Sequence, residues 1–150
     1  MTTVHLRAHA RVTPEQFVAA LTDFGPGRSQ TFGNSADADL KVHSVSQDHA
    51  DVTEGSHGIW ERMTYDWSNP SHVTLTTTDS NMWGGHSSHT YDLAPTSDGG
   101  TDVDYTIVRE GKNLRGRLVG AVLSVGGKGI VTRAFQDSVK SIDSRNGYSS

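Results

Sequence analysis

Residues 101–125 read TDVDYTIVREGKNLRGRLVGAVLSV, and within this stretch the spacing of the apolar residues changes once. Val103, Tyr105 and Ile107 alternate with polar residues, which is the pattern of a half-buried β-strand. After Lys112 the apolar residues recur every three or four positions, which is the pattern of an amphipathic helix. The stretch therefore predicts a final strand that leads directly into a C-terminal helix.

This predicted helix extends from about 113 to 145 and is the only predicted element long enough to cover a sheet. Its apolar pattern is interrupted at Gly126 and Gly127 and continues from Ile130. Because glycine weakens a helix interior, we expect a kink, a bulge or a short break at the two glycines.

Upstream of residue 101, alternating segments follow one another at the spacing of hairpins, which predicts an antiparallel meander. The segments lie at about 40–46, around Ala50 and Val52, and at 59–67, 72–79 and 86–93, with a turn predicted at 55–58.

The N-terminal residues predict a strand over 4–12 followed by a helix. Thr13, Pro14 and Gln16 have the spacing of a capping box with proline at the first helical position. The apolar spacing continues to Phe24, and Gly25 is expected to end the helix. Residues 26–39 are predicted to form a loop with one short helical turn.

An antiparallel sheet with one apolar face needs a cover, and the C-terminal helix can provide it. We therefore expect an α+β fold in which a curved antiparallel sheet of about seven strands wraps around that helix. The space between sheet and helix is the expected ligand cavity. One domain is expected over 1–146, with a frayed tail at 147–150.

Composition excludes several classes of protein. The 150 residues include no Cys, which excludes a disulfide framework and favours a reducing compartment, so a cytoplasmic location is expected. A net charge of -4 gives no basic field for nucleic acid. No unbroken apolar run approaches the ~20 residues that span a bilayer, and no signal peptide is expected.

Two runs carry a resemblance to a known family. Residues 58–67 (GIWERMTYDW), residues 116–120 (GRLVG) and the order of elements resemble the bacterial polyketide cyclase/dehydrase-like (SRPBCC) branch of the START/Bet v 1 superfamily. The resemblance covers essentially the whole chain and includes no diagnostic catalytic motif. It implies a helix-grip fold around a hydrophobic cavity, in a family whose members bind lipids or polyketides or cyclise polyketides.

Glu61 has the same strand parity as the apolar Met63 and Tyr65, which predicts a carboxylate on the inner face of the sheet. An unpaired buried carboxylate is costly and has a raised pKa, so Glu61 could act as a general acid or base or anchor a ligand. Alternatively it is paired with an arginine, for which Arg109 is the candidate, or a bulge at Gly58 turns it outward.

Parity also assigns other side chains to the inner face, including Asp79. Glu61, His89 and Arg109 form the candidate catalytic set. Trp83 lies on a glycine-flanked loop and is a candidate guard of the cavity opening. The candidate ligand-binding residues are Met63, Tyr65, Trp67, Leu75, Thr77, Trp83, Tyr91, Tyr105, Ile107 and Leu118. The alternative is that the tyrosines and His89 only fill core space.

Metal and cofactor sites are not expected. His86 and His89 are three residues apart on a predicted strand, so they point to opposite faces and cannot chelate one ion. No nucleophile elbow or nucleotide-binding glycine motif is present. The basic C-terminal helix could contact anionic lipid, or it could simply present a solvated face.

These observations support two functional hypotheses. The first is a carrier or sensor that binds a hydrophobic small molecule, lipid or polyketide-like, in the cavity. The second is a cofactor-independent polyketide cyclase or dehydratase that uses acid–base residues of the cavity.

Overall fold

The computed structural model describes residues 1–149, and within them the chain forms a seven-stranded antiparallel sheet of order β1-β7-β6-β5-β4-β3-β2. This confirms the predicted α+β class and strand number. The strands are β1 (Thr2–Ala10), β2 (Lys41–Val45), β3 (His49–Ser56), β4 (Ile59–Asp66), β5 (His72–Ser80), β6 (Ser88–Pro95) and β7 (Thr101–Arg109).

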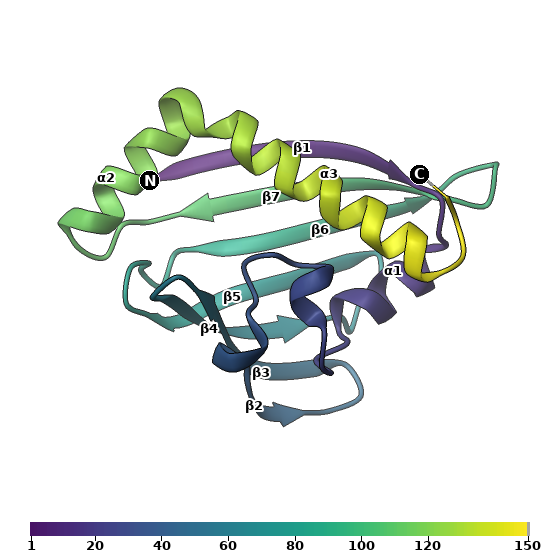
Figure 1. Cartoon of the computed structure of the whole chain (residues 1–150), viewed down its shortest axis with the longest axis horizontal. Coiled ribbons are helices and arrows are strands. Elements are labelled where there is room, and N and C mark those ends of the chain that lie inside the picture. The colour runs from purple at the N-terminus through teal and green to yellow at the C-terminus, as the bar shows by residue number, and fades with distance from the viewer. Residues whose placement is uncertain (150) are drawn as a thin grey trace.

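The helical segments lie against one face of the curved sheet (Figure 1). The hydrophobic core lies between this face and the helices and includes Phe17, Val52, Val103 and Ile142. The helices are α1 (Pro14–Leu21), two short 3₁₀ turns (Arg28–Gln30 and Asp37–Asp39), α2 (Leu114–Val122), a π-helical turn (Leu123–Gly127) and α3 (Lys128–Arg145).

The start of α1 has the predicted capping box, but the helix is shorter than expected. The Gln16 backbone N–H donates to the Thr13 hydroxyl at 3.2 Å, and the Gln16 side chain accepts from the Thr13 N–H at 2.9 Å. The helix ends at Leu21 and not at Phe24. Phe24 instead turns inward, where its ring packs edge-on against Tyr65.

The β3–β4 hairpin turn is tighter than the predicted four residues. His57 and Gly58 both have positive φ, of 55° and 79°, as a two-residue turn between twisted strands requires. Gly55 belongs to β3, where a Cβ atom would lie 2.5 Å from the Ile59 carbonyl oxygen. Glycine is therefore required here by close approach of the next strand.

A bulge in β5 overturns the prediction for Asp79. Met63 pairs with Thr77 but Arg62 pairs with Asp79, so Thr78 is one residue too many for the ladder. The extra residue reverses the alternation of the strand beyond it. Asp79 consequently points outward and Ser80 is buried.

The predicted break at Gly126–Gly127 is a π-helical turn, so the C-terminal helix bends and continues (Figure 1). The α3 half buries Phe135, Val139 and Ile142 against the sheet. By length and composition the helix Leu114–Arg145 could also span a membrane, with a mean hydropathy of 1.3 over 18 residues, of which 17% are buried. In α2 the apolar Leu114, Leu118 and Val122 are exposed, and so are the basic Arg115 and Arg117.

The domain boundary at 146 stays a prediction. Residues 147–149 follow the end of α3, and the Tyr148 backbone N–H still donates to the Asp143 carbonyl. Ser150, the last residue of the predicted frayed tail, lies outside the described residues.

Candidate functional site

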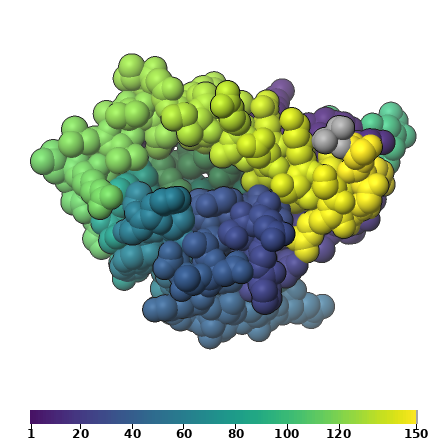
Figure 2. Space-filling model, viewed as in Figure 1, coloured from purple at the N-terminus to yellow at the C-terminus, as the bar shows by residue number. Residues whose placement is uncertain are grey.

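A cavity of about 540 Å³ lies between the sheet and the C-terminal helix. Its floor comes from β4, β5, β6 and β7, and its opening lies between α3 and residues 29–34. Figure 2 shows this hollow between the green and yellow C-terminal helix and the dark blue segment. The volume is within the usual range for a small-molecule site, about 300–1,000 Å³.

Most residues assigned to the inner face by parity line this cavity. Their roles in binding or catalysis stay predictions, but their positions are clear. From the candidate sets, the lining includes Met63, Tyr65, Leu75, Trp83, His89, Tyr91, Tyr105, Ile107 and Arg109.

Four candidates lie elsewhere. Glu61 and Thr77 are buried behind the lining, where the Thr77 hydroxyl donates to the Glu61 carboxylate. Trp67 follows the end of β4 and packs against the core. Leu118 is 61% exposed on the outside of α2, so its assignment to the cavity is corrected.

The orientation of α2 explains the error for Leu118. Gly116 and Gly120 are the buried residues of this helix. A Cβ atom on Gly116 would lie 2.3 Å from the Met82 carbonyl oxygen, so only glycine permits this close contact. The glycine face therefore packs inward, and the apolar side chains at helical spacing face solvent.

Glu61 and Arg109 form an ion pair, which was one of the alternatives considered for Glu61 from the sequence. The Arg109 Nη1 donates to Glu61 Oε2 at 2.7 Å, and both side chains are about nine-tenths buried. Burial alone would raise the pKa of Glu61, but the Arg109 guanidinium outweighs burial and holds the pKa well below its usual range. Glu61 is therefore a fixed anion at neutral pH.

His89 connects this pair to the cavity wall. Arg109 Nη2 lies 2.8 Å from His89 Nε2, and because arginine can only donate, Nε2 must accept. Burial, aided by the Arg109 charge, lowers the pKa of His89, which favours the neutral ring. Its proton is then on Nδ1, which lies 2.5 Å from the Tyr105 hydroxyl.

Tyr105 consequently accepts from His89 and keeps its own hydroxyl proton to donate. Burial raises the pKa of Tyr105 to about 12, so the phenol stays protonated. Its ring stacks on Tyr91, with centroids 4.4 Å apart, and contacts Phe135 of α3. These three rings form an aromatic wall with a phenol donor.

Sequence reasoning missed a second buried ion pair beside the cavity. Arg28 Nε donates to Glu54 Oε1 at 2.6 Å, and Arg28 Nη2 donates to the Tyr65 hydroxyl at 3.0 Å. The Tyr65 hydroxyl in turn donates to Glu54. Extending the β3 alternation from Ala50 and Val52 would have identified Glu54, whereas Arg28 lies in a segment without periodicity.

Trp83 lies at the cavity end nearest α2. Its loop bridges to Gly111, and the Arg109 guanidinium lies 4.9 Å from the centre of its ring. This cation–π contact is a further interaction that holds the Arg109 guanidinium in place. Trp83 is therefore a buried residue of the cavity wall. Its role as a guard of the opening stays a prediction.

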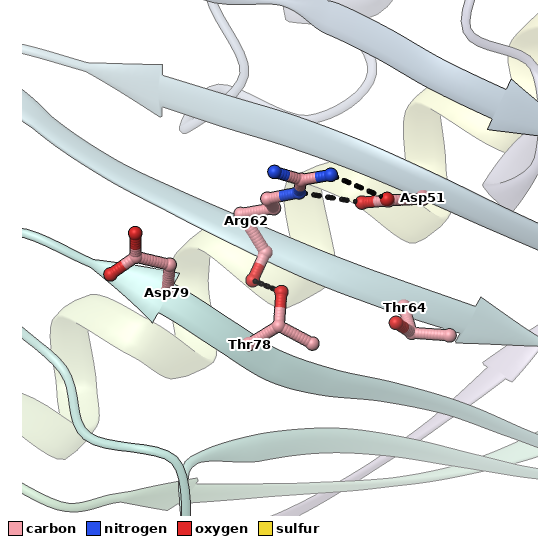
Figure 3. Close-up of a pocket in the computed structure, with 5 residues that line it drawn as sticks. All are labelled: Asp51, Arg62, Thr64, Thr78 and Asp79. Atoms are coloured by element: carbon pink, nitrogen blue, oxygen red, sulfur yellow. Dashed lines mark hydrogen bonds and ion pairs between the residues drawn. The ribbon is translucent and has the colours of Figure 1, made fainter.

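A second pocket, of about 370 Å³, lies on the outer face of the sheet. Figure 3 shows its residues on three adjacent strands, with Arg62 paired to Asp51 through two hydrogen bonds of 2.9 and 2.7 Å. Arg62 therefore points outward. The pocket is shallow and polar and its central charges are already paired, so we do not regard it as the functional site.

Among residues 1–149, no three His, Cys, Asp or Glu side chains are grouped so that they could hold a metal ion. His86 is exposed and pairs with Glu110, whereas His89 is buried in the network described above.

Comparison with known proteins was informative only at the level of structure. No protein-family model and no curated protein matches the sequence. Among solved structures, protein TTHA0849 from Thermus thermophilus has a TM-score of 0.73 at 12% identity, over 97% of this chain and 99% of its own. A START superfamily protein from Mycobacterium smegmatis has a TM-score of 0.69 at 10% identity, over 97% of both chains.

The chain has the START-like helix-grip fold. The Zhui aromatase/cyclase from Streptomyces sp. R1128 has the same helix-grip fold, with a TM-score of 0.67 at 11% identity over 95% of this chain and 92% of its own. At such identities the likeness shows the fold alone, so the function must be argued from the cavity.

Proposed function

We propose that this helix-grip protein binds a hydrophobic small molecule, lipid or polyketide-like, in the cavity between sheet and helix, as a carrier or sensor. The observation that carries the proposal is the cavity lining, in which an aromatic and aliphatic surface surrounds a few fixed polar groups. Such a lining favours a largely apolar ligand with an oxygen that can accept from Tyr105. A cytoplasmic location is part of the proposal and is supported by the absence of Cys.

The ion pairs favour binding over acid–base catalysis. Glu61 is held as an anion by Arg109, and Arg28 forms a buried pair with Glu54. A general acid or base needs a pKa near the working pH, and Glu61 has the opposite shift. The charged groups therefore serve best as fixed supports for the cavity wall.

A polyketide cyclase or dehydratase is the second candidate, and the contact between His89 and Tyr105 is the observation that favours it. The Tyr105 hydroxyl can donate its proton to a substrate oxygen, and the His89 Nδ1–H then stabilises the phenolate that is left, without a cofactor. A solved structure with the same fold is described as an aromatase/cyclase, which supports this candidate by analogy only.

Titration of tryptophan emission with an unsaturated fatty acid, a sterol and an aromatic polyketide tests the proposal. Trp83 lines the cavity, so bound ligand should change its emission, and Trp83→Phe should remove most of the response. Trp60→Phe, at an exposed position, is the control. Absence of any response from the whole panel would contradict ligand binding.

Tyr105→Phe should weaken binding of a responding ligand about two- to twelvefold, because one neutral hydrogen bond contributes about 0.5–1.5 kcal/mol. Tyr148→Phe, which leaves the cavity untouched, should bind like the wild type. Mass spectrometry of the bound ligand separates the two candidates. An unchanged ligand supports a carrier, whereas loss of water or ring closure that Tyr105→Phe abolishes supports the enzyme.

A further inference from the structure

The outer face of the C-terminal helix carries a row of apolar side chains without a partner. We call this row the apolar stripe; its members are between 61 and 91% exposed. They are Leu114, Leu118, Val122, Val125 and Ile130. A surface helix normally turns its polar side to water, and a contiguous exposed apolar surface marks an interaction site.

The π-helical turn keeps the stripe on one side of the helix. Ile130 follows Val125 by five residues, which in a continuous α-helix would place the two side chains about 140° apart. The turn Leu123–Gly127 accommodates one extra residue, which reduces this separation to about 40°. The bend therefore extends the stripe onto α3 instead of ending it.

The charge around the stripe is uniformly positive. Residues 111–136 contain five of the 13 Lys and Arg residues and none of the 17 Asp and Glu residues, although the whole chain has a net charge of -4. Arg115 and Arg117 lie in the same helical turns as Leu114 and Leu118 and are exposed. Among residues 1–149, Lys112 is the only one of the five that pairs with a carboxylate, that of Asp79.

We propose that the apolar stripe and its basic flanks form a docking surface for an anionic lipid bilayer, with the helix lying flat in the interface. An exposed aliphatic row beside arginines is the composition of an interfacial helix, and the positive charge complements acidic headgroups.

A protein partner fits the surface less well than a bilayer. Interfaces between proteins are anchored by aromatic side chains seated in pockets, whereas the stripe is entirely aliphatic and convex. Its length is about 24 Å, from the 16 steps between Leu114 and Ile130 at about 1.5 Å each. A bilayer can accept such a ridge without a complementary groove.

The stripe also borders the cavity opening, because Ile130 belongs to both. Docking would therefore place the opening beside the bilayer, and an apolar ligand could enter from lipid. This last step rests on the proposed function, whereas the docking surface does not.

Flotation with vesicles tests the docking surface without any ligand. The full chain should bind vesicles of phosphatidylcholine containing one quarter phosphatidylglycerol at about 0.1 M salt, bind pure phosphatidylcholine much more weakly, and dissociate at about 1 M salt. Leu114→Gln with Val125→Gln should weaken partition about tenfold or more, since both side chains would lose their burial in lipid. Neither residue lines the cavity.

Matched controls separate the surface from general effects. Val42→Gln with Val45→Gln removes exposed valines on β2 and should not change partition. Arg115→Gln with Arg117→Gln should weaken binding to anionic vesicles about tenfold, whereas Lys41→Gln with Lys140→Gln, which loses the same charge elsewhere, should change it less than about twofold.

Three results would overturn the proposal. The first is that the protein does not bind anionic vesicles. The second is that the stripe variant and the β2 control variant lose vesicle binding equally. The third is a concentration-dependent dimer in sedimentation equilibrium that dissociates when Leu114→Gln and Val125→Gln are introduced. The last result would make the stripe an interface between two copies of this chain. The tryptophan titration uses no vesicles, so failure of docking and failure of ligand binding are separate results.

Discussion

Arg109 links three features of the cavity, because it pairs with Glu61, donates to His89 and lies against the Trp83 ring. Removing it should therefore leave the Glu61 carboxylate buried and uncompensated. We expect Arg109→Met to lower the free energy of unfolding by about 3–5 kcal/mol, as measured by urea denaturation.

The outer pair provides the control for that measurement. Arg62→Met breaks a partly exposed pair with Asp51 and should cost no more than about 1 kcal/mol. Adding Glu61→Gln to Arg109→Met should recover part of the loss. Equal effects of Arg62→Met and Arg109→Met would show that the Glu61 pair is not buried in solution.

His89 should make stability depend on pH in a definite direction. Its pKa is lower in the folded protein than in the unfolded chain, where it is about 6.5. The contribution of neutral His89 to the free energy of unfolding is therefore fully present above pH 6.5 and is lost as the pH falls through the lower, folded-state pKa. Carboxylate partners raise the pKa of His9 and His49, and these residues act in the opposite direction.

Comparison of wild type with His89→Gln isolates this effect, because the other histidines are common to both. Between pH 7.5 and 5.5, the free energy of unfolding of the wild type should fall more steeply than that of His89→Gln. Parallel pH profiles from urea melts would mean that folding does not shift the pKa of His89, and a shallower fall for the wild type would mean that the ring is charged in the folded state.

At the level of elements, the packing of α2 depends on two glycines with different surroundings. Gly116 lies against the Met82 carbonyl, whereas a Cβ atom on Gly120 would only reach ordinary contact with Thr2, at 3.6 Å. We expect Gly116→Ala to destabilise the protein by about 1–3 kcal/mol. Gly120→Ala should be neutral or stabilising by up to about 1 kcal/mol, because alanine favours a helix.

Thermal melts of the two variants check this difference. Both substitutions add the same methyl group to the same helix, so helix propensity cancels in the comparison. A Gly116→Ala protein as stable as Gly120→Ala would show that α2 does not pack closely on the Met82 loop.

The strands were largely predictable from the sequence because their alternation is local. Parity placed Glu61 and Arg109 on one inner face, and the structure shows them paired. It failed at Asp79, because a bulge depends on pairing with the next strand. It also could not find Arg28, whose position is set by Glu54 on a distant strand.

The C-terminal helix shows a different limit of sequence reasoning. Its existence and its irregularity at Gly126–Gly127 follow from its own residues, and the structure confirms both. Which side of α2 faces inward does not follow, because apolar spacing normally marks the buried face. Here the close contact at Gly116 decides the orientation, which is why Leu118 was assigned to the cavity.

In the whole molecule, the cavity opening lies between two segments that are far apart in sequence. Residues 29–34 lie on one side of it and residues 130–138 on the other. A ligand that contacts both should slow amide hydrogen exchange in both segments together. Exchange in β6 and β7, which are paired on both sides, should change less, because it reports global opening.

Mass-spectrometric hydrogen exchange with and without a responding ligand measures this. Protection confined to β3, β4 and the end of β5 would place the ligand on the polar outer pocket instead. Protection of 29–34 without 130–138 would indicate that the ligand contacts only one side of the opening.

The π-helical turn also has a consequence at the level of the gene. Because the turn holds one residue more than an α-helical turn, the two halves of the C-terminal helix are in phase only at their present length. An in-frame deletion of one codon within 123–127 would rotate the faces of α2 and α3 by about 100° relative to each other, without replacing any other amino acid. A single small deletion would thus change which residues of α2 face solvent while the residues that α3 buries stay the same.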